Sequence, residues 1–264
     1  MSVVESRNSA HFNFGHKLKS SPIMSETARL YLLDNPVYSA DAIIVGIRDN
    51  EMAFHQSPFY PGGGGQPADE GEVHFHDGTM LKIVSAYSDS EGIIWHKLIS
   101  KAPQDVAGQV AHLKIDTKKR LALTRYHTVL HILNTTALHT YNAWITGVQI
   151  GTEYSRIDFK FENFSPEIVP VLEESVNNVL TKNHPIKAYY ISEDEFSSRT
   201  DLLRTLTVKP PIHNNQVRVV EIEGFDAQAC GGTHVHSTGE IGRLSIFRID
   251  NKGRINKRLY IRLE

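Results

Sequence analysis

Residues 116–141 read DTKKRLALTRYHTVLHILNTTALHTY, and the character of the sequence changes where they begin. Asp116 and Thr117 are residue types that favour the start of a helix. Apolar residues then recur every three or four positions, at Leu121, Leu123, Tyr126, Leu130, Leu133 and Ala137. The stretch predicts a helix that runs to about Tyr141.

The sequence before this helix is typical of strands. Short apolar runs at residues 42–47, 81–86, 92–98 and 106–113 are separated by Gly, Asp, Asn and Ser. Runs of this length between turn-forming residues predict a compact all-β domain from Thr27 to about Leu113.

The sequence after the helix mixes strand and helix patterns. Residues 153–161, 217–222 and 241–249 resemble strands, and residues 166–183 predict a second helix with Pro166 in its first turn. This order indicates an α+β class. A chain of 264 residues, 40% of them hydrophobic, is long enough for two domains, which we place at residues 24–113 and 114–264.

The N-terminal residues 1–23 are polar, mildly basic and aperiodic, and they lack the apolar run of a signal peptide. We expect them to be a disordered, dispensable extension, with Met24 close to the true domain start. The single cysteine, Cys230, excludes an intrachain disulfide, and no stretch approaches the roughly 20 apolar residues of a membrane span. We therefore expect a cytoplasmic protein without a membrane partner, whose oligomeric state the sequence leaves open.

Charge is distributed unevenly along the chain. The net charge is -2, but residues 1–113 carry 8 Lys and Arg against 13 Asp and Glu, whereas residues 114–264 carry 20 against 17. Basic residues are concentrated between Arg243 and Glu264. A polyanion would therefore bind the second half. The alternative is an edge strand protected by charge.

Two short spacings bring together four residues of the types that bind zinc. His127 and His131 are four positions apart on the predicted helix, so both imidazoles share one face. Cys230 and His234 flank Gly-Gly-Thr, and the glycines allow the backbone to turn sharply. Three imidazoles and one thiolate form a complete ligand set for tetrahedral Zn²⁺.

Each half of this set also has an ordinary explanation, namely a packed histidine pair and a buried, inert thiol. Together, however, the two tight pairs favour zinc. His139 and His236 lie near the motifs but are left out, because His236 would point away from His234 in an extended segment.

A glycine-rich loop lies between the first and second apolar runs, at residues 62–65. Four glycines and Gln66 offer bare amide donors and a side-chain amide to a ligand such as phosphate. The residues of a P-loop or a dinucleotide fingerprint are missing. The alternative is a hairpin turn packed on the neighbouring domain.

These motifs together resemble a known family. The stretches RYHTVLHIL and ACGGTHVHSTGEIG are similar to the paired HxxxH and CxxxH motifs of the editing domain shared by alanyl- and threonyl-tRNA synthetases and free-standing editing proteins. SPFYPGGGGQPADEGEV, GVQIGTEYSRIDF and VRVVEIEGFDAQACGGTHV resemble the alanyl branch. The resemblance covers nearly all of residues 27–264 and is to the free-standing alanyl-tRNA editing proteins of medium length.

The resemblance implies a small β-barrel-like N-terminal domain with the glycine-rich loop, followed by an α+β editing domain with a zinc site. It implies a hydrolase that removes serine or glycine from the acceptor end of mischarged tRNA for alanine. Ser57, at a position where the family usually has threonine, and Gln66 would then be catalytic. Gly63, Gly64 and Gly65 would bind substrate.

Three other classes of zinc protein are alternatives to this function. A non-catalytic tRNA-binding module with a structural zinc fits a closed set of four ligands. A zinc peptidase is disfavoured because HTVLH lacks the glutamate of HExxH. A zinc deaminase is disfavoured because its HxE and PCxxC pattern is absent.

Overall fold

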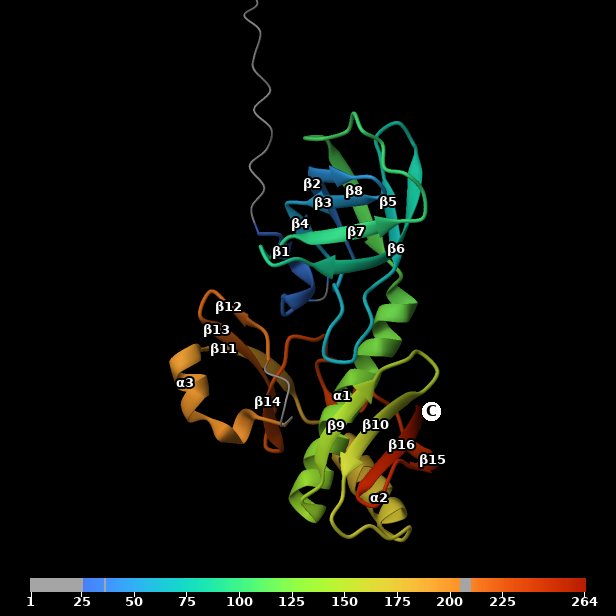
Figure 1. The fold of residues 1–264 in the computed structure, drawn as a ribbon, viewed down its shortest axis with the longest axis vertical. Coiled ribbons are helices and arrows are strands. Elements are labelled where there is room, and N and C mark those ends of the chain that lie inside the picture. Colours follow the sequence, from blue (N-terminus) through green and yellow to red (C-terminus); the bar gives the residue numbers. More distant parts are fainter. Residues whose placement is uncertain (1–25, 36, 205–209) are drawn as a thin grey trace, which may run out of the picture.

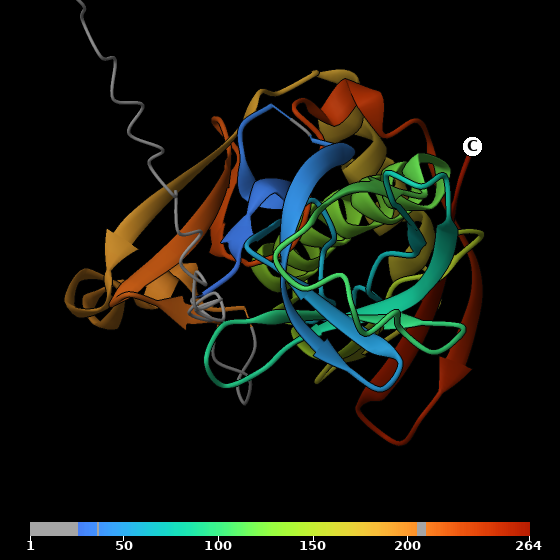
Figure 2. The same cartoon turned by 90° about the horizontal axis from the view of Figure 1, so that it is seen from above.

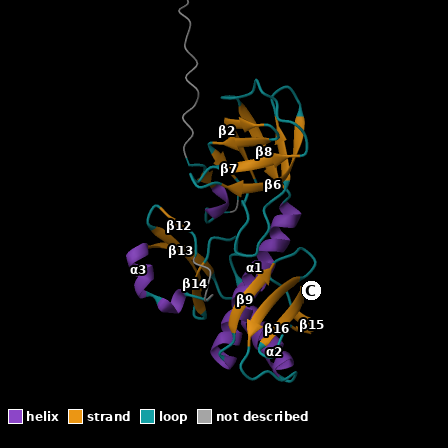
Figure 3. Ribbon diagram, in the orientation of Figure 1, coloured by secondary structure: helices purple, strands orange, loops and turns teal. Residues whose placement is uncertain are grey.

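The computed structural model describes residues 26–35, 37–204 and 210–264. The expected extension at residues 1–23 and the expected start at Met24 lie outside these residues. Figure 1 shows a barrel of strands, a long helix α1 (Thr117–Tyr141) that runs away from it, and two open sheets beside that helix. The longer helices all lie in the half of the molecule away from the barrel (Figure 3).

Six antiparallel strands close into the barrel in the order β2-β3-β7-β6-β5-β8. They are β2 (Ser39–Arg48), β3 (Glu51–Phe54), β5 (Gly71–His74), β6 (Met80–Ser88), β7 (Ile94–Leu98) and β8 (Val110–Ile115). In β8, Ala111, Leu113 and Ile115 are buried while the residues between them are exposed, which is the alternation of a barrel wall. The all-β expectation for this part of the chain is confirmed, with closure leaving no free sheet edge.

Two short strands lie beside the barrel and position residues discussed below. β1 (Ala28–Arg29) and β4 (Gln56–Ser57) pair in parallel, with Arg29 opposite Ser57. The single-turn helix η1 (Leu30–Leu32) follows β1 and buries Tyr31.

Ser57 and His96 form a fully buried chain of hydrogen bonds in the barrel. The backbone N–H of Phe59 donates to Ser57 Oγ over 3.1 Å, and Ser57 Oγ lies 2.8 Å from His96 Nε2. His96 Nδ1 lies 3.1 Å from the carbonyl oxygen of Met52, which only accepts. Nδ1 therefore carries the proton and Nε2 accepts from Ser57, so every polar atom of both side chains has a partner.

This arrangement predicts acid sensitivity of the barrel. Burial lowers the pKa of His96 from 6.5 to about 4, so the unfolded chain binds a proton in this interval that the folded barrel excludes. The contribution of His96 to the free energy of unfolding is fully present above about pH 6.5. It is lost as the pH falls towards 4, and the total loss is about 3 kcal/mol. Urea unfolding of wild type and His96→Gln at pH 7 and pH 5 measures this difference. Equal losses on acidification in the two proteins would contradict it.

Helix α1 begins and ends at recognisable caps. The carboxylate of Asp116 accepts the backbone N–H of Lys119 over 2.9 Å, and Asn142 ends the helix in the left-handed region with φ of 48°. The predicted helix is therefore confirmed. Its expected apolar positions are buried at Leu123, Tyr126, Leu130, Leu133 and Ala137, but Leu121 is 45% exposed.

Beside α1 lies an antiparallel sheet in the order β15-β16-β10-β9. Its strands are β15 (Leu244–Asn251), β16 (Asn256–Leu263), β10 (Ser155–Lys160) and β9 (Trp144–Gln149). The basic segment from Arg243 to Glu264 therefore forms an edge strand only in part. β15 lies at the edge of the sheet, whereas β16 lies between β15 and β10. In β16 the buried residues are Lys257, Leu259 and Ile261, and they alternate with partly exposed ones.

Helix α2 (Ile168–Thr181) packs against α1 and buries Leu172, Val176 and Leu180. It begins two residues later than Pro166, which lies in the preceding turn and whose carbonyl accepts the N–H of Val169. The expected start at Pro166 was therefore wrong. Pro170 lies in the first turn, where a backbone N–H has no helical partner to lose.

A third sheet lies to one side of α1, as Figure 2 shows from above. It consists of β11 (Ile186–Ser192), β13 (Gln216–Ile222), β12 (Ile212–His213) and β14 (Asp226–Ala229). Short helices α3 (Glu193–Ser198), η2 (Thr200–Leu202) and η3 (Thr238–Glu240) complete this part. Strand β14 ends directly before Cys230.

The protein is therefore a mixed α/β fold with a closed six-stranded barrel and few helices. No helix among the described residues combines the length and apolar character of a membrane span. The division into domains at residues 113 and 114 stays a prediction; in the structure β8 ends at Ile115 and α1 begins at Thr117.

Candidate functional site

The four residues that the sequence predicts as zinc ligands lie close together in the structure. Helix α1 presents His127 and His131 on one face, and the loop after β14 presents Cys230 and His234 to that face. One ligand atom from each lies within 4.8 Å of the others. Cys230 Sγ is 3.4 Å from Nε2 of His127 and 3.4 Å from Nε2 of His234.

Hydrogen bonds to Nδ1 of His127 and of His234 orient the Nε2 atoms of these rings towards Cys230 Sγ. His127 Nδ1 lies 2.7 Å from Gln66 Oε1, and an amide oxygen only accepts, so Nδ1 carries the proton. The Thr128 hydroxyl donates to the carbonyl of Thr124 over 2.9 Å, so it accepts from His234 Nδ1 over 3.2 Å. Both Nε2 atoms therefore keep their lone pairs.

Burial also keeps the ligand atoms ready for a cation. It lowers the pKa of His127 to about 4 and, with the neighbouring imidazoles, holds the pKa of His131 and His234 well below 6.5. All three rings are neutral at physiological pH. Burial raises the pKa of the Cys230 thiol, and a coordinating metal ion would deprotonate it.

This geometry fits tetrahedral zinc. Zinc–nitrogen and zinc–sulfur bonds of about 2.1 and 2.3 Å give a sulfur–nitrogen edge of about 3.6 Å, close to the 3.4 Å between Sγ and each Nε2. Oriented imidazoles with protonated Nδ1 atoms are the usual supports of zinc-binding histidines. The four residues therefore fit a metal ion.

Arg218 holds the loop that carries Cys230. Its Nη1 donates to the carbonyls of Cys230 and Gly232, each over 3.0 Å. A Cβ on Gly232 would lie 2.1 Å from Cε1 of His127. Glycine is required there because the loop backbone passes directly against the imidazole.

The glycine-rich loop forms a tight turn that joins the barrel side of the molecule to the cluster. Gly63 and Gln66 exchange both backbone hydrogen bonds, at 3.0 and 2.9 Å, across Gly64 and Gly65, which both have positive φ. The carbonyl of Gly65 accepts the N–H of Ile150 over 2.9 Å, next to β9. The turn thereby brings Gln66 to His127.

The predicted substrate-binding glycines separate into two groups. Gly63 and Gly64 line the large cavity described below. Gly65 does not, because it packs on Val148, whose Cγ1 would lie 2.4 Å from an added Cβ. For Gly65 the structure therefore favours the packed hairpin turn over a ligand contact.

Ser57 does not join the cluster. Its hydroxyl is fully buried in the barrel and occupied by His96 and Phe59, so the expectation that it lies beside the metal ligands is not met. His139 and His236, which the sequence does not place in the site, are both exposed and lie outside the ligand group.

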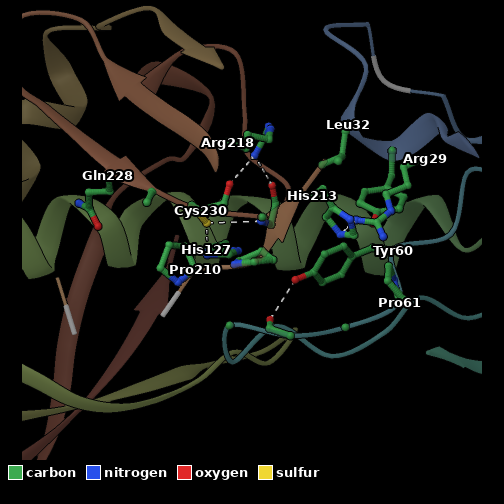
Figure 4. Close-up of a pocket in the computed structure, with 18 of the residues that line it drawn as sticks. Arg29, Leu32, Tyr60, Pro61, His127, Pro210, His213, Arg218, Gln228 and Cys230 are labelled. Atoms are coloured by element: carbon green, nitrogen blue, oxygen red, sulfur yellow. Dashed lines mark hydrogen bonds between the residues drawn. The ribbon is translucent and has the colours of Figure 1, made fainter. Parts of the chain in front are cut away.

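A cavity of about 970 Å³ opens from the cluster. His127 and Cys230 line one part of it, and Arg29, Tyr60 and His213 line another (Figure 4). His131 also lines the cavity. Its volume lies near the upper end of the range for small-molecule sites, about 300–1,000 Å³. The cavity is thus large enough for a ligand that extends well beyond the four metal-binding residues.

The sequence is similar to those of known proteins. The chain is 35% identical over 246 residues to an alanyl-tRNA editing protein of Methanosarcina acetivorans. The aligned region covers 90% of this chain and 99% of that relative. The chain belongs to the alanyl-tRNA editing protein family. A second member, from Saccharolobus solfataricus, is 31% identical over 89% of this chain and 98% of its own length.

The editing family is also related to larger proteins. An alanine–tRNA ligase of Korarchaeum cryptofilum is 35% identical over 84% of this chain but only 24% of its own length. Residues 217–260 match the family model described as the threonyl and alanyl tRNA synthetase second additional domain. This segment contains Cys230 and His234.

Several residues of the site were missed in the sequence. They are Arg29, Asn134, Arg204, His213, Arg218 and Gln228, all of which line the cavity. Asn134 follows His131 by three positions, so helical spacing alone placed it on the ligand face. The others come from separate segments that only the tertiary fold brings together.

Replacing Gln66 with leucine is expected to lower zinc affinity by about 10–100-fold, because His127 loses the acceptor that orients its ring. Gln66→Glu keeps an oxygen acceptor and should retain most of the affinity. Competition with a chromophoric chelator measures it. Gln104→Leu, whose amide bonds only the carbonyl of Ala102, is the control. Unchanged affinity in Gln66→Leu would exclude this role.

Proposed function

We propose that this protein is a zinc-dependent hydrolase that removes serine or glycine from mischarged tRNA for alanine. Family membership supports the substrate class, since the relatives are named alanyl-tRNA editing proteins. The His127, His131, Cys230 and His234 set supports zinc as the resident ion. The aminoacylated acceptor end of tRNA is then the partner.

The observation that carries this proposal is the composition of the cavity beside the cluster. Within the described residues, the buried side-chain nitrogen and oxygen atoms without a hydrogen-bond partner all belong to Arg29, Asn134, Arg204 and Arg218. Each of the four lines the cavity. Because buried polar groups are normally paired, their concentration around one cavity indicates a polar ligand.

Three of these residues are arginines, and their unpaired atoms are donors. Arg29 Nη2 lies 3.4 Å from Glu26 Oε1 in an ion pair, so the free donors are the three Nε atoms. Guanidinium donors match the phosphate oxygens of a nucleic acid backbone. Tyr190, which is 48% exposed, lines the same cavity and offers a ring on which a base can stack. A terminal nucleotide held by these groups would extend its aminoacyl ester towards the cluster.

The reaction is the hydrolysis of that ester. A water oxygen bonds to the carbonyl carbon, the bond from this carbon to the ribose oxygen breaks, and the proton from water passes to the ribose oxygen. Bound zinc supplies Lewis acidity and a fixed point for orienting the substrate. Gln66 keeps His127 in the ligand tautomer, and Arg218 holds the loop of Cys230 in place.

A second candidate is a non-catalytic tRNA-binding module. The observation in its favour is the closed ligand set: four protein ligands leave a tetrahedral zinc ion no open position, as in structural sites. The cavity argues for the hydrolase, because a structural zinc needs no adjoining space for a ligand.

Deacylation assays distinguish the two. Purified protein is incubated with Ser-, Gly- and Ala-tRNA for alanine, and release of each amino acid is measured against a protein-free control. The hydrolase releases serine or glycine faster than alanine. Binding of all three tRNAs without release above the control would establish the second candidate instead.

A further inference from the structure

The wall of the cavity next to the cluster contains one buried acceptor without a partner. Asn134 is 3% exposed, and its Oδ1 has no hydrogen-bond partner. The other unpaired buried atoms around the cavity are arginine nitrogens, which only donate. Among these unpaired buried atoms, Asn134 Oδ1 is therefore the one acceptor and the others are arginine donors.

The position of Asn134 relates it to the metal ligands. It lies on α1 three residues after His131 and seven after His127, so the three side chains follow one face of the helix. Asn134, His127 and His131 line the same cavity. An aminoacyl group held at the cluster would therefore be within one helical turn of the Asn134 amide.

The chemistry of the Asn134 amide favours a neutral ligand group. Asn134 is buried, and Arg29, Arg204 and Arg218 line the same cavity. A single uncharged amide oxygen does not offset the desolvation of a charged ammonium group, but it does satisfy a hydroxyl. The acceptor therefore fits an uncharged donor better than a cation.

We propose that Asn134 determines the specificity of this site by accepting a hydrogen bond from the side-chain hydroxyl of a seryl group. This inference rests on the proposed function for its substrate class. It assigns to Asn134 the role that the sequence suggested for Ser57, whose hydroxyl is occupied inside the barrel. An alanyl group, which has no hydroxyl, would leave the amide oxygen unpaired.

The first test measures binding, so it does not depend on hydrolysis. Wild type and Asn134→Leu are titrated with the non-hydrolysable amides 3′-serylamino-adenosine and 3′-alanylamino-adenosine, which differ only in the hydroxyl. Wild type should bind the seryl amide about 10-fold more tightly, and Asn134→Leu should bind both alike. Equal affinities in wild type, or an unchanged preference in Asn134→Leu, would overturn the proposal.

The second test measures release of serine and of glycine from tRNA for alanine. Asn134→Leu should lower kcat/KM for serine about 10-fold and leave glycine within about twofold. Asn134→Asp keeps an acceptor oxygen and should recover most of the serine rate. Thr136→Val is the matched control on the same helix, because the Thr136 hydroxyl bonds only the carbonyl of Ile132.

The outcomes of the two tests separate this inference from the proposed function. Equal losses for serine and glycine would mean that Asn134 supports the pocket or binds the common α-amino group, and would overturn the hydroxyl role. A seryl preference that depends on Asn134 without any hydrolysis would sustain the inference and refute the hydrolase.

Discussion

Replacing Cys230 with alanine is expected to abolish stoichiometric zinc binding and to lower kcat/KM for Ser-tRNA by more than about 100-fold. The thiolate is the one soft ligand of the set, and its sulfur lies 3.4 Å from two imidazole nitrogens. Elemental analysis of protein purified without chelator measures the metal. Because zinc would bind only the folded chain, its loss should also lower the free energy of unfolding.

A chelator separates loss of the metal from loss of packing. Chelation should lower the melting temperature of wild type and leave that of Cys230→Ala unchanged, since the variant holds no metal to remove. His139→Ala, an exposed histidine on the same helix, should behave like wild type. A chelator effect of equal size in wild type and Cys230→Ala would show that the metal is bound elsewhere.

Replacing Asp69 with alanine is expected to lower the free energy of unfolding by about 3–5 kcal/mol. Asp69 and Arg120 form an ion pair whose side chains are 1% and 4% exposed. Arg120 also donates to the carbonyl of Pro58, and Asp69 accepts the N–H of Tyr60, each over 2.7 Å. The variant would leave a buried guanidinium without its carboxylate.

The same ion pair secures the segment that contains the glycine-rich loop to the first turns of α1. Its loss should therefore also weaken zinc binding, because Gln66 reaches His127 from that segment. Urea unfolding measures the stability. Asp201→Ala breaks an exposed pair with Arg199 and should change stability far less. Similar losses in the two variants would contradict the prediction.

Much of the site was predictable because its ligands come in two local pairs. Helical spacing places His127 and His131 on one face, and the Gly-Gly turn confines Cys230 and His234 to one loop, so neither pair depends on the rest of the fold. The caps and the apolar period of α1 are equally local. Such features are set by residues within a few positions of one another.

The errors arose where distant packing decides the outcome. Ser57 has the same hydroxyl whether it faces a ligand or the interior, and the occupant of the barrel, His96, lies 39 positions away. The basic run from Arg243 to Glu264 left open a polyanion site or an edge strand, and only pairing with the distant β10 puts β16 inside the sheet and leaves β15 at its edge. Arg29 and His213 share the cavity although they lie 184 positions apart, and no local pattern predicts that.

The position of β16 has a consequence for how the chain folds as it leaves the ribosome. The barrel strands lie between Ser39 and Ile115 and pair only with one another, so the barrel can close while the remainder is still being synthesised. The second sheet cannot, because β10 pairs with β16, which is synthesised about 100 residues later: Ser155 of β10 lies opposite Ile261 of β16. Until β16 has been synthesised, β10 and β15 each present an unpaired strand edge, and a truncation that removes β16 would leave both edges exposed.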